Sequence, residues 1–323
     1  MIFTKKIALI LRYALQVLSL QHKENKFMEQ IVEKYINPLT DFGFKRIFGT
    51  EFNKELLISF LNALFEGEQE IKDVSYLNSE VFGANEVARK AIFDVYCQTV
   101  DGGKFIVEMQ NAYQEFYKDR SIYYSSFPIN QQGRKGDWNY ELQPVYTIGI
   151  LNFSLPEDRN NPASLYREVK LMDIKTHEVF YDKLTYLYIE LEKFNKTETE
   201  LVTMLDKWLF VLKNLSNLMS RPAQLQERVF TKLFEAAEIA KFDSNELRSY
   251  EQSINAYRDI KNSLDTAKKE GKAEGFVEGM EKGKVEGRAE GFVEAARNLK
   301  QMGLDISQIS KATGLSIEEI KKL

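Results

Sequence analysis

The chain has 323 residues, with 44 Lys and Arg against 48 Asp and Glu, 12% aromatic residues and six prolines, a composition typical of a soluble globular protein of two or three domains. A single cysteine and two histidines exclude a disulfide framework and argue against a zinc site, so any metal ion must be held by oxygen ligands. The net charge of −4 argues against a globally basic surface for nucleic acids, so DNA contacts would depend on local basic clusters or bound cations.

Residues 1–20 have the outline of a secretory signal peptide, because two lysines precede an apolar stretch. Arg12 interrupts that stretch, no small-x-small cleavage site follows, and the run is shorter than the roughly 20 apolar residues that cross a bilayer. We expect residues 1–27 to be a dispensable or non-native extension, with an amphipathic surface helix and a targeting signal as alternatives. Met28 is the alternative start, and the lone Cys97 favours a cytoplasmic protein without stable membrane association.

The segment 40–65 carries apolar residues at spacings of three and four, broken once at Gly49 and Thr50, which predicts two short helices. β-Branched and aromatic residues then predict three strands, at 72–82, 90–100 and 104–111. An Asp-Gly-Gly turn between the last two predicts a hairpin.

The rest of the chain changes from a mixed to a helical pattern. A Tyr-rich helical pattern at 113–132 and a nearly continuous apolar run at 143–153 complete the order helix, three strands, helix, strand. Further predicted elements are strands in VKLMDI and LTYLYIEL and helices at 198–219, 222–240 and 244–268. The expected divisions after the extension are a mixed domain at 28–195, a helical domain at 196–268, a Gly-periodic helix at 269–300 and a helical hairpin at 301–323.

Two carboxylates lie on the predicted hairpin. Side chains alternate along a strand, so Asp94 shares a face with Tyr96, and Glu108 shares a face with Gln110. A turn centred on Gly102 would place Asp94 opposite Gln110 and Glu108 opposite Tyr96. Such neighbours are about 5 to 8 Å apart at Cβ, which lets two carboxylates share one divalent cation.

The alternative is that both carboxylates are solvent-facing residues on a half-exposed sheet. Both strands, however, carry apolar residues on both faces, which indicates burial. Two buried like charges without a counter-ion would repel each other, and bound Mg²⁺, or Mn²⁺ as a substitute, would remove that cost.

Three stretches together carry a family resemblance: INPLTDFGFKRIFG, then FDVYCQTVDGGKFIVEMQN, then a helix with RSIYYSS. They resemble the recombination-promoting nucleases, often labelled transposases, of the PD-(D/E)XK nuclease superfamily, over roughly residues 30–300. The resemblance implies an α+β fold with a restriction-endonuclease-like mixed sheet flanked by helices. It also implies a metal-dependent DNA endonuclease related to transposon or recombination functions.

The resemblance assigns site residues as well. Asp41, Asp94, Glu108 and Gln110 match the catalytic positions, although Gln110 stands where the superfamily most often has a lysine. Asp94 and Glu108, with the carbonyl of Met109, would hold Mg²⁺, which lowers the pKa of a bound water. Gln110 can orient that water but cannot deprotonate it, which leaves the general base open.

Asp41 or Glu55, from the preceding helices, would complete the metal shell. For Asp41 a helix N-cap is an equal alternative, since a cap Asp satisfies free amides. The expected DNA backbone contacts are the basic pairs Lys45 and Arg46, Arg89 and Lys90, and Arg134 and Lys135.

Four further side chains have two possible interpretations each. Arg120 is either a phosphate clamp or, as we favour, an ordinary surface residue. Cys97 is expected to be a buried, inert thiol and not a nucleophile. Trp138 and Trp208 are expected to be core or interface aromatics and not nucleotide-stacking platforms.

Glycines recur every four residues from Gly271 to Gly291, and they would cost a helix about 5 to 6 kcal/mol relative to alanine. This indicates either self-association through a close helix contact, which we favour, or a flexible tether. Residues 301–323 contain two apparent capping boxes, Asp305 with Gln308 and Ser316 with Glu319, and resemble a helix-turn-helix. Acidic residues open its second helix, so packing or oligomerisation is favoured over DNA reading.

The leading hypothesis is therefore a Mg²⁺-dependent DNA endonuclease that forms a homo-oligomer through its carboxy-terminal helices. The rival hypothesis is a non-catalytic interaction or regulatory protein that retains the nuclease fold. The glutamine at position 110 and the acidic mixed domain keep that rival open.

Overall fold

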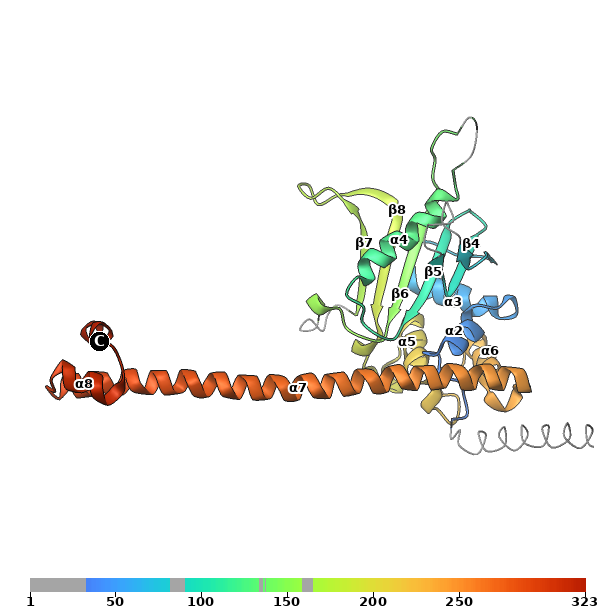
Figure 1. Ribbon diagram of the computed structural model, residues 1–323. Helices are drawn as coiled ribbons and strands as arrows, with labels where there is room; N and C mark the ends of the chain where they lie inside the picture. The colour runs from blue at the N-terminus through green and yellow to red at the C-terminus, as the bar shows by residue number, and fades with distance from the viewer. Residues whose placement is uncertain (1–32, 82–90, 134–135, 137, 159–164) are drawn as a thin grey trace, which may run out of the picture. The chain divides into compact units, whose positions relative to one another are not determined.

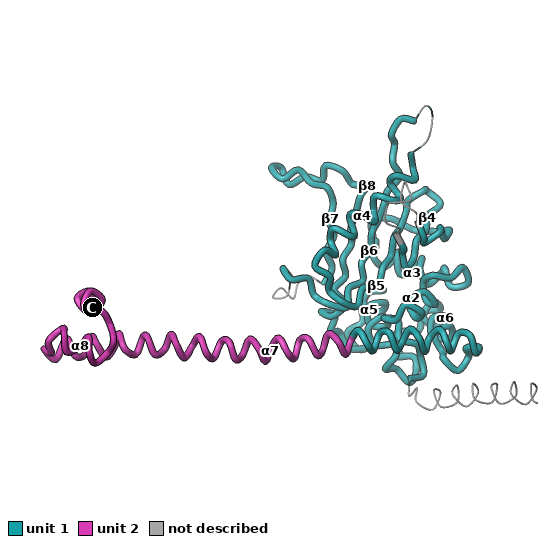
Figure 2. The backbone as a smooth tube through the Cα atoms, viewed as in Figure 1, with its two compact units in different colours: residues 1–260 teal, residues 261–323 magenta. Residues whose placement is uncertain are grey.

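The computed structural model describes residues 33–81, 91–133, 136, 138–158 and 165–323. The chain forms two compact units, residues 1–260 and residues 261–323 (Figure 2). Within the described ranges no helix is both long and apolar enough to cross a membrane. The expectations for residues 1–27 fall outside the described residues.

A six-stranded mixed sheet forms the centre of the first unit (Figure 1). Its order is β1 (Val74–Tyr76), β4 (Val95–Thr99), β5 (Lys104–Gln110), β6 (Val145–Leu151), β8 (Val179–Glu190) and β7 (Tyr166–Met172). The first three strands form an antiparallel meander, β6 runs parallel to β5, and a small pair, β2 (Glu80–Val81) with β3 (Ala91–Ile92), stands beside them. The predicted order of helix, three strands, helix and strand is confirmed.

Helices cover both faces of this sheet. One face packs on α2 (Asp41–Phe48), α3 (Lys54–Leu64), α5 (Met204–Asn214) and α6 (Arg228–Ala237). The opposite face packs on α4 (Tyr117–Asn130), which connects β5 to β6 (Figure 1). The apolar run of β6 is buried because it lies between these two helical layers.

The hairpin between β4 and β5 corrects one expectation. Tyr96 lies opposite Ile106, so paired residue numbers sum to 202, and the predicted pairing of Glu108 with Tyr96 is wrong by two residues. The turn is centred on Asp101, and Gly102 takes the positive φ of 90° that such a turn requires. A shift of two residues preserves the alternation, so Glu108 and Gln110 keep the predicted face.

The strand carrying Asp94 is not continuous, which corrects a second expectation. β3 pairs with β2 in a separate two-stranded sheet, whereas the six-stranded sheet takes up the chain only at Val95. Between them, Phe93 packs with Tyr96 and Phe127 on the α4 side. Strict alternation along residues 90–100 would instead place Phe93 on the face of Val95, opposite Tyr96. The interruption changes the alternation locally, and Asp94 lies directly before the first residue of β4.

The N-cap of helix α2 excludes one of the two roles that the sequence left open for Asp41. Thr40, not Asp41, is the N-cap: its hydroxyl accepts a hydrogen bond from Gly43 N at 3.0 Å and donates one to Asn37 O at 2.8 Å. A Cβ on Gly43 would stand 2.1 Å from Asn37 O, so only glycine fits this turn.

We expect Thr40→Ala to lower the free energy of unfolding by about 1–2 kcal/mol, because it removes the cap and one buried hydrogen bond. Urea unfolding monitored by circular dichroism measures this loss. Thr40→Ser keeps the hydroxyl and is the matched control. Equal losses in both variants would contradict the role of the cap.

The second half of the chain is helical after β8. Helix α7 (Ser244–Gln301) is followed by α8 (Ile306–Thr313) and α9 (Ile317–Lys322), and the second unit has its own small core of Ala296, Ile309 and Ile320. The capping box of Ser316 with Glu319 is confirmed. The one predicted for Asp305 with Gln308 is wrong, because the Asp305 side chain caps α8 by accepting from Ser307 N.

Candidate active site

Asp94 is held at the end of the meander by the neighbouring strand. Its Oδ2 accepts a hydrogen bond from Met109 N at 2.9 Å. Burial raises the pKa of Asp94 and the charge of Asp41 raises it further, whereas the Met109 N–H and the cations Lys45 and Arg120 lower it. The carboxylate therefore lies among charges of both signs.

Glu108 is the more deeply buried carboxylate, with 8% of its surface exposed in the middle of the sheet. Burial is the main reason that its pKa is raised to about 8, and the charge of Asp94 adds to the shift. Arg120 opposes the shift, with its Nη2 lying 3.5 Å from Glu108 Oε2. Without a bound metal ion, the Glu108 side chain is therefore mostly protonated at neutral pH.

Arg120 is not the uncommitted surface residue that the sequence analysis favoured. Its Nη2 donates to Gln110 Oε1, and its Nη1 donates to Gln114 Oε1 at 2.7 Å. Its guanidinium lies over the rings of Tyr117 and Tyr124, with its carbon 5.3 and 5.6 Å from their centroids. Arg120 therefore fixes Gln110 by its carbonyl oxygen, which leaves the Gln110 NH₂ group to donate to a water or substrate oxygen.

The backbone of Met109 faces the same edge of β5 as Asp94. Gln110 O accepts from Asn152 N at 2.9 Å on the β6 side, and successive residues of a strand point their N–H and C=O groups to opposite edges. The Met109 carbonyl therefore lies on the Asp94 side. Glu108 is near enough for the charge of Asp94 to raise its pKa, and carboxylate and carbonyl oxygens of this kind suit Mg²⁺ better than zinc.

The burial of the Asp94 and Glu108 carboxylates is a second reason to expect a divalent ion. Burial raises the pKa of both Asp94 and Glu108, and the charge of Asp94 adds to the shift at Glu108, so a cation would offset the cost of their burial. Among the described residues there is no group of three or more His, Cys, Asp or Glu side chains placed to hold a metal. Further ligands would be water or phosphate oxygens.

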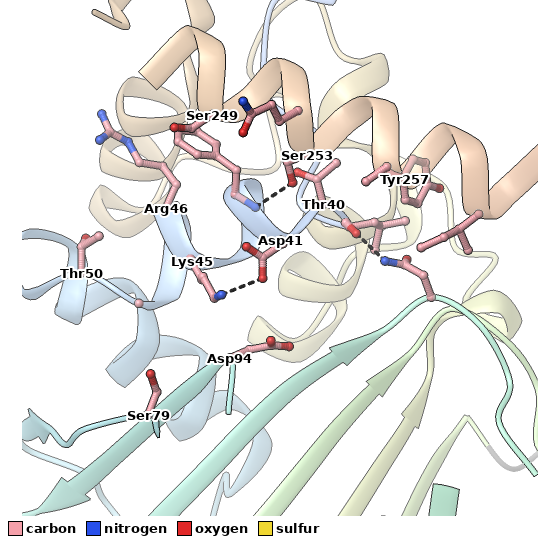
Figure 3. Close-up of a pocket in the computed structure, with 17 residues that line it drawn as sticks. Thr40, Asp41, Lys45, Arg46, Thr50, Ser79, Asp94, Ser249, Ser253 and Tyr257 are labelled. Carbon is pink, nitrogen blue, oxygen red and sulfur yellow. Dashed lines mark hydrogen bonds and ion pairs between the residues drawn. The ribbon is translucent and has the colours of Figure 1, made fainter. Parts of the chain in front are cut away.

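Asp41 and Asp94 both line a cavity of about 820 Å³ (Figure 3). The Asp41 carboxylate lies in the first turn of α2. Its side chain is 65% exposed and forms a 2.7 Å ion pair with Lys45. Arg46, also at this cavity, pairs with Glu246 at 2.5 Å. Both predicted DNA-binding cations of α2 therefore border the site and are already paired with carboxylates.

The remaining predicted site residues are elsewhere or outside the described ranges. Glu55 pairs with Lys232 at 2.5 Å, and both line a separate cavity. The basic pairs at 89–90 and 134–135 fall in the parts of the chain that the structure does not describe.

Burial agrees with the expectations for Cys97 and Trp208, and Trp138 is half-buried. Cys97 is fully buried, and burial raises the pKa of its thiol to about 12, so it is inert. Trp208 is a fully buried core residue against Phe48 and Phe60. Trp138 packs on Tyr140, with ring centroids 4.8 Å apart.

The wall of the cavity opposite Asp94 was not expected from the sequence. Ser249, Gln252, Ser253 and Tyr257 of α7 line it (Figure 3). Their spacing of three and four residues puts them on one face of a helix, which the sequence could have shown. Nothing in the sequence shows that this face is turned toward a residue so much earlier in the chain.

A mixed sheet with an antiparallel meander, a helical connection to a parallel strand, and paired carboxylates at the end of the meander is the architecture of the PD-(D/E)XK nucleases. The family model described as PD-(D/E)XK nuclease family transposase matches residues 38–267. The chain belongs to this family. The searches of curated proteins and of solved structures found no match.

Proposed function

We propose that the protein is a metal-dependent DNA endonuclease that hydrolyses phosphodiester bonds, with a role in transposition or recombination. Family membership supports a nuclease-related function. The observation that carries the proposal is the pair Asp94 and Glu108. Burial raises the pKa of both carboxyl groups, and the backbone N–H of Met109 donates a hydrogen bond to Asp94. Perturbed carboxylates that converge with a backbone oxygen are typical of a functional site.

Each residue of the site has one task in this proposal. A bound Mg²⁺, or Mn²⁺ in its place, would activate a water and offset the charge of the phosphate. Asp94 and Glu108 would hold the ion with the Met109 carbonyl. Arg120 positions Glu108 and Gln110, and the Gln110 NH₂ group orients the attacking water.

Self-association through α7 and a cytoplasmic location are part of the same proposal. The second unit exposes large apolar side chains beside glycines that no other part of the described structure approaches within 4 Å. The apolar side chains are Phe276, Val277, Met280, Val285 and Phe292. A helix with six open glycines is costly alone, so a second copy of α7 is the expected partner.

The same exposed helix is the observation that favours the rival function, a non-catalytic interaction protein. Gln110 and a Glu108 that is protonated at neutral pH without metal are compatible with that rival.

Removal of the metal tests the proposal. We expect supercoiled plasmid DNA to be nicked and linearised in Mg²⁺ or Mn²⁺, and cleavage to stop in excess EDTA, because no side chain of the site can replace the ion. Gel electrophoresis measures the products. Cleavage that persists in EDTA would contradict the proposed site, and no cleavage in either metal would favour the interaction protein.

A further inference from the structure

The cavity beside Asp94 is larger than a metal site needs. It measures about 820 Å³ and lies between α2 and the first turns of α7, with Asp94 on its wall (Figure 3). That volume is within the roughly 300–1,000 Å³ of small-ligand sites. All of its lining residues belong to the first unit.

The wall formed by α7 carries no charged side chain. Ser249 and Gln252 offer hydroxyl and amide groups, and Ser253 accepts from Phe42 N and can still donate. Ala256, Tyr257 and Ile260 add apolar and aromatic surface. Neutral donors and acceptors next to an aromatic ring suit the edge and the face of a nucleobase. They do not suit a row of phosphates, which calls for unpaired cations.

The charges at the cavity support the same distinction. Lys45 is paired with Asp41 and Arg46 with Glu246, while Asp94 adds a further carboxylate. A duplex presents two charged backbones and stacks its bases inside, so it has no neutral group to place in such a hollow. An unpaired nucleotide has one.

We propose that this cavity receives the base of an unpaired nucleotide whose phosphodiester bond lies at Asp94, so that the substrate is single-stranded DNA or duplex DNA with an unpaired stretch. This inference rests on the proposed nuclease function and adds its substrate class. Tyr257 provides the stacking surface, and the polar groups of α7 contact the base edge. Arg120 and Gln110 lie apart from the cavity lining and act on the phosphate side.

Filling the cavity tests the proposal without removing any polar group. Ala256 lines the cavity and is exposed, so Ala256→Trp can occupy the space without disturbing the core. Asn255, the preceding residue of α7, is exposed and outside the lining, which makes Asn255→Trp the matched control. Circular dichroism checks that both variants remain folded.

The substrates are one end-labelled oligonucleotide as a single strand, as a full duplex, and as a duplex with a central bubble, each with Mg²⁺. We expect the single strand and the bubble to be cut at least about tenfold faster than the duplex, and Ala256→Trp, but not Asn255→Trp, to lose that advantage. Equal rates on the duplex, or equal rates for the two variants, would overturn the inference and leave the nuclease proposal standing.

If no substrate is cut, the nuclease proposal fails, and fluorescence anisotropy with the same oligonucleotides in EDTA decides on the cavity. Tighter binding of the single strand that Ala256→Trp weakens would support the cavity as a base site. Equal binding of single strand and duplex would overturn it.

Discussion

Asp94→Asn and Glu108→Gln are each expected to lower the rate of phosphodiester cleavage by at least about 100-fold, the scale on which loss of one charge-stabilising group acts in an active site. Each change preserves the shape of the side chain and removes one negative ligand. In Asp94→Asn the new amide would also present either an oxygen or an NH₂ group to the Met109 N–H, which weakens the contact that fixes this residue. Time courses of plasmid nicking measure the loss.

The control for these variants is Asp101→Asn, which removes a carboxylate from the exposed turn of the same hairpin. It is expected to cut DNA at the rate of the unmodified protein. The double variant at 94 and 108 is expected to be little worse than either single variant, because the two residues act on one ion. Cleavage that survives in both single variants would place the active centre elsewhere.

The sequence predicted the faces of the strands and the order of the elements well where the chain follows a strict period. Alternation along β5 put Glu108 and Gln110 on one face, and the structure keeps them there despite a register shift of two residues. The two helices of segment 40–65 and the order of strands follow from equally regular patterns. These features depend on local spacing, which a sequence contains.

The predictions failed where an irregularity interrupts the period. The break between β3 and β4 moved Phe93 to the α4 face, and alternation alone cannot locate such a break. The N-cap of α2 is Thr40, whose hydroxyl accepts a hydrogen bond from Gly43 N, and Asp41 forms an ion pair with Lys45 instead.

Long-range packing accounts for the rest. From the sequence, Arg120 was expected to be a surface residue of a helix. The packing of α4 on the sheet brings its guanidinium to Glu108, and the sequence does not contain that contact. The cavity wall from α7 is the extreme case, since Tyr257 and Asp94 are brought together by a core that includes four other helices.

The second large effect concerns stability in the absence of metal. Glu108 has a pKa of about 8 in the folded, metal-free protein against an ordinary value of 4.5. Between these values the folded state binds the proton and the unfolded state does not, so the free energy of unfolding falls as pH rises from about 5 to 8. Glu108→Gln removes this ionisation and should therefore stabilise the protein above pH 8, by up to a few kcal/mol at about 1.4 kcal/mol per pH unit.

Urea unfolding in EDTA at pH 5.5, 7.0 and 8.5 measures this effect, with Glu68→Gln, an exposed change, as the control. The unmodified protein and the Glu68 variant should lose stability along the same curve, while the Glu108 variant should lose less. Mg²⁺ at pH 8.5 should stabilise the unmodified protein more than the Glu108 variant, since the ion binds the ionised carboxylate and must displace the proton below pH 8. Parallel pH curves for all three proteins would contradict the raised pKa of Glu108. A gain in stability with a loss of cleavage in one variant would show that this buried charge is kept for function, because the fold is more stable without it.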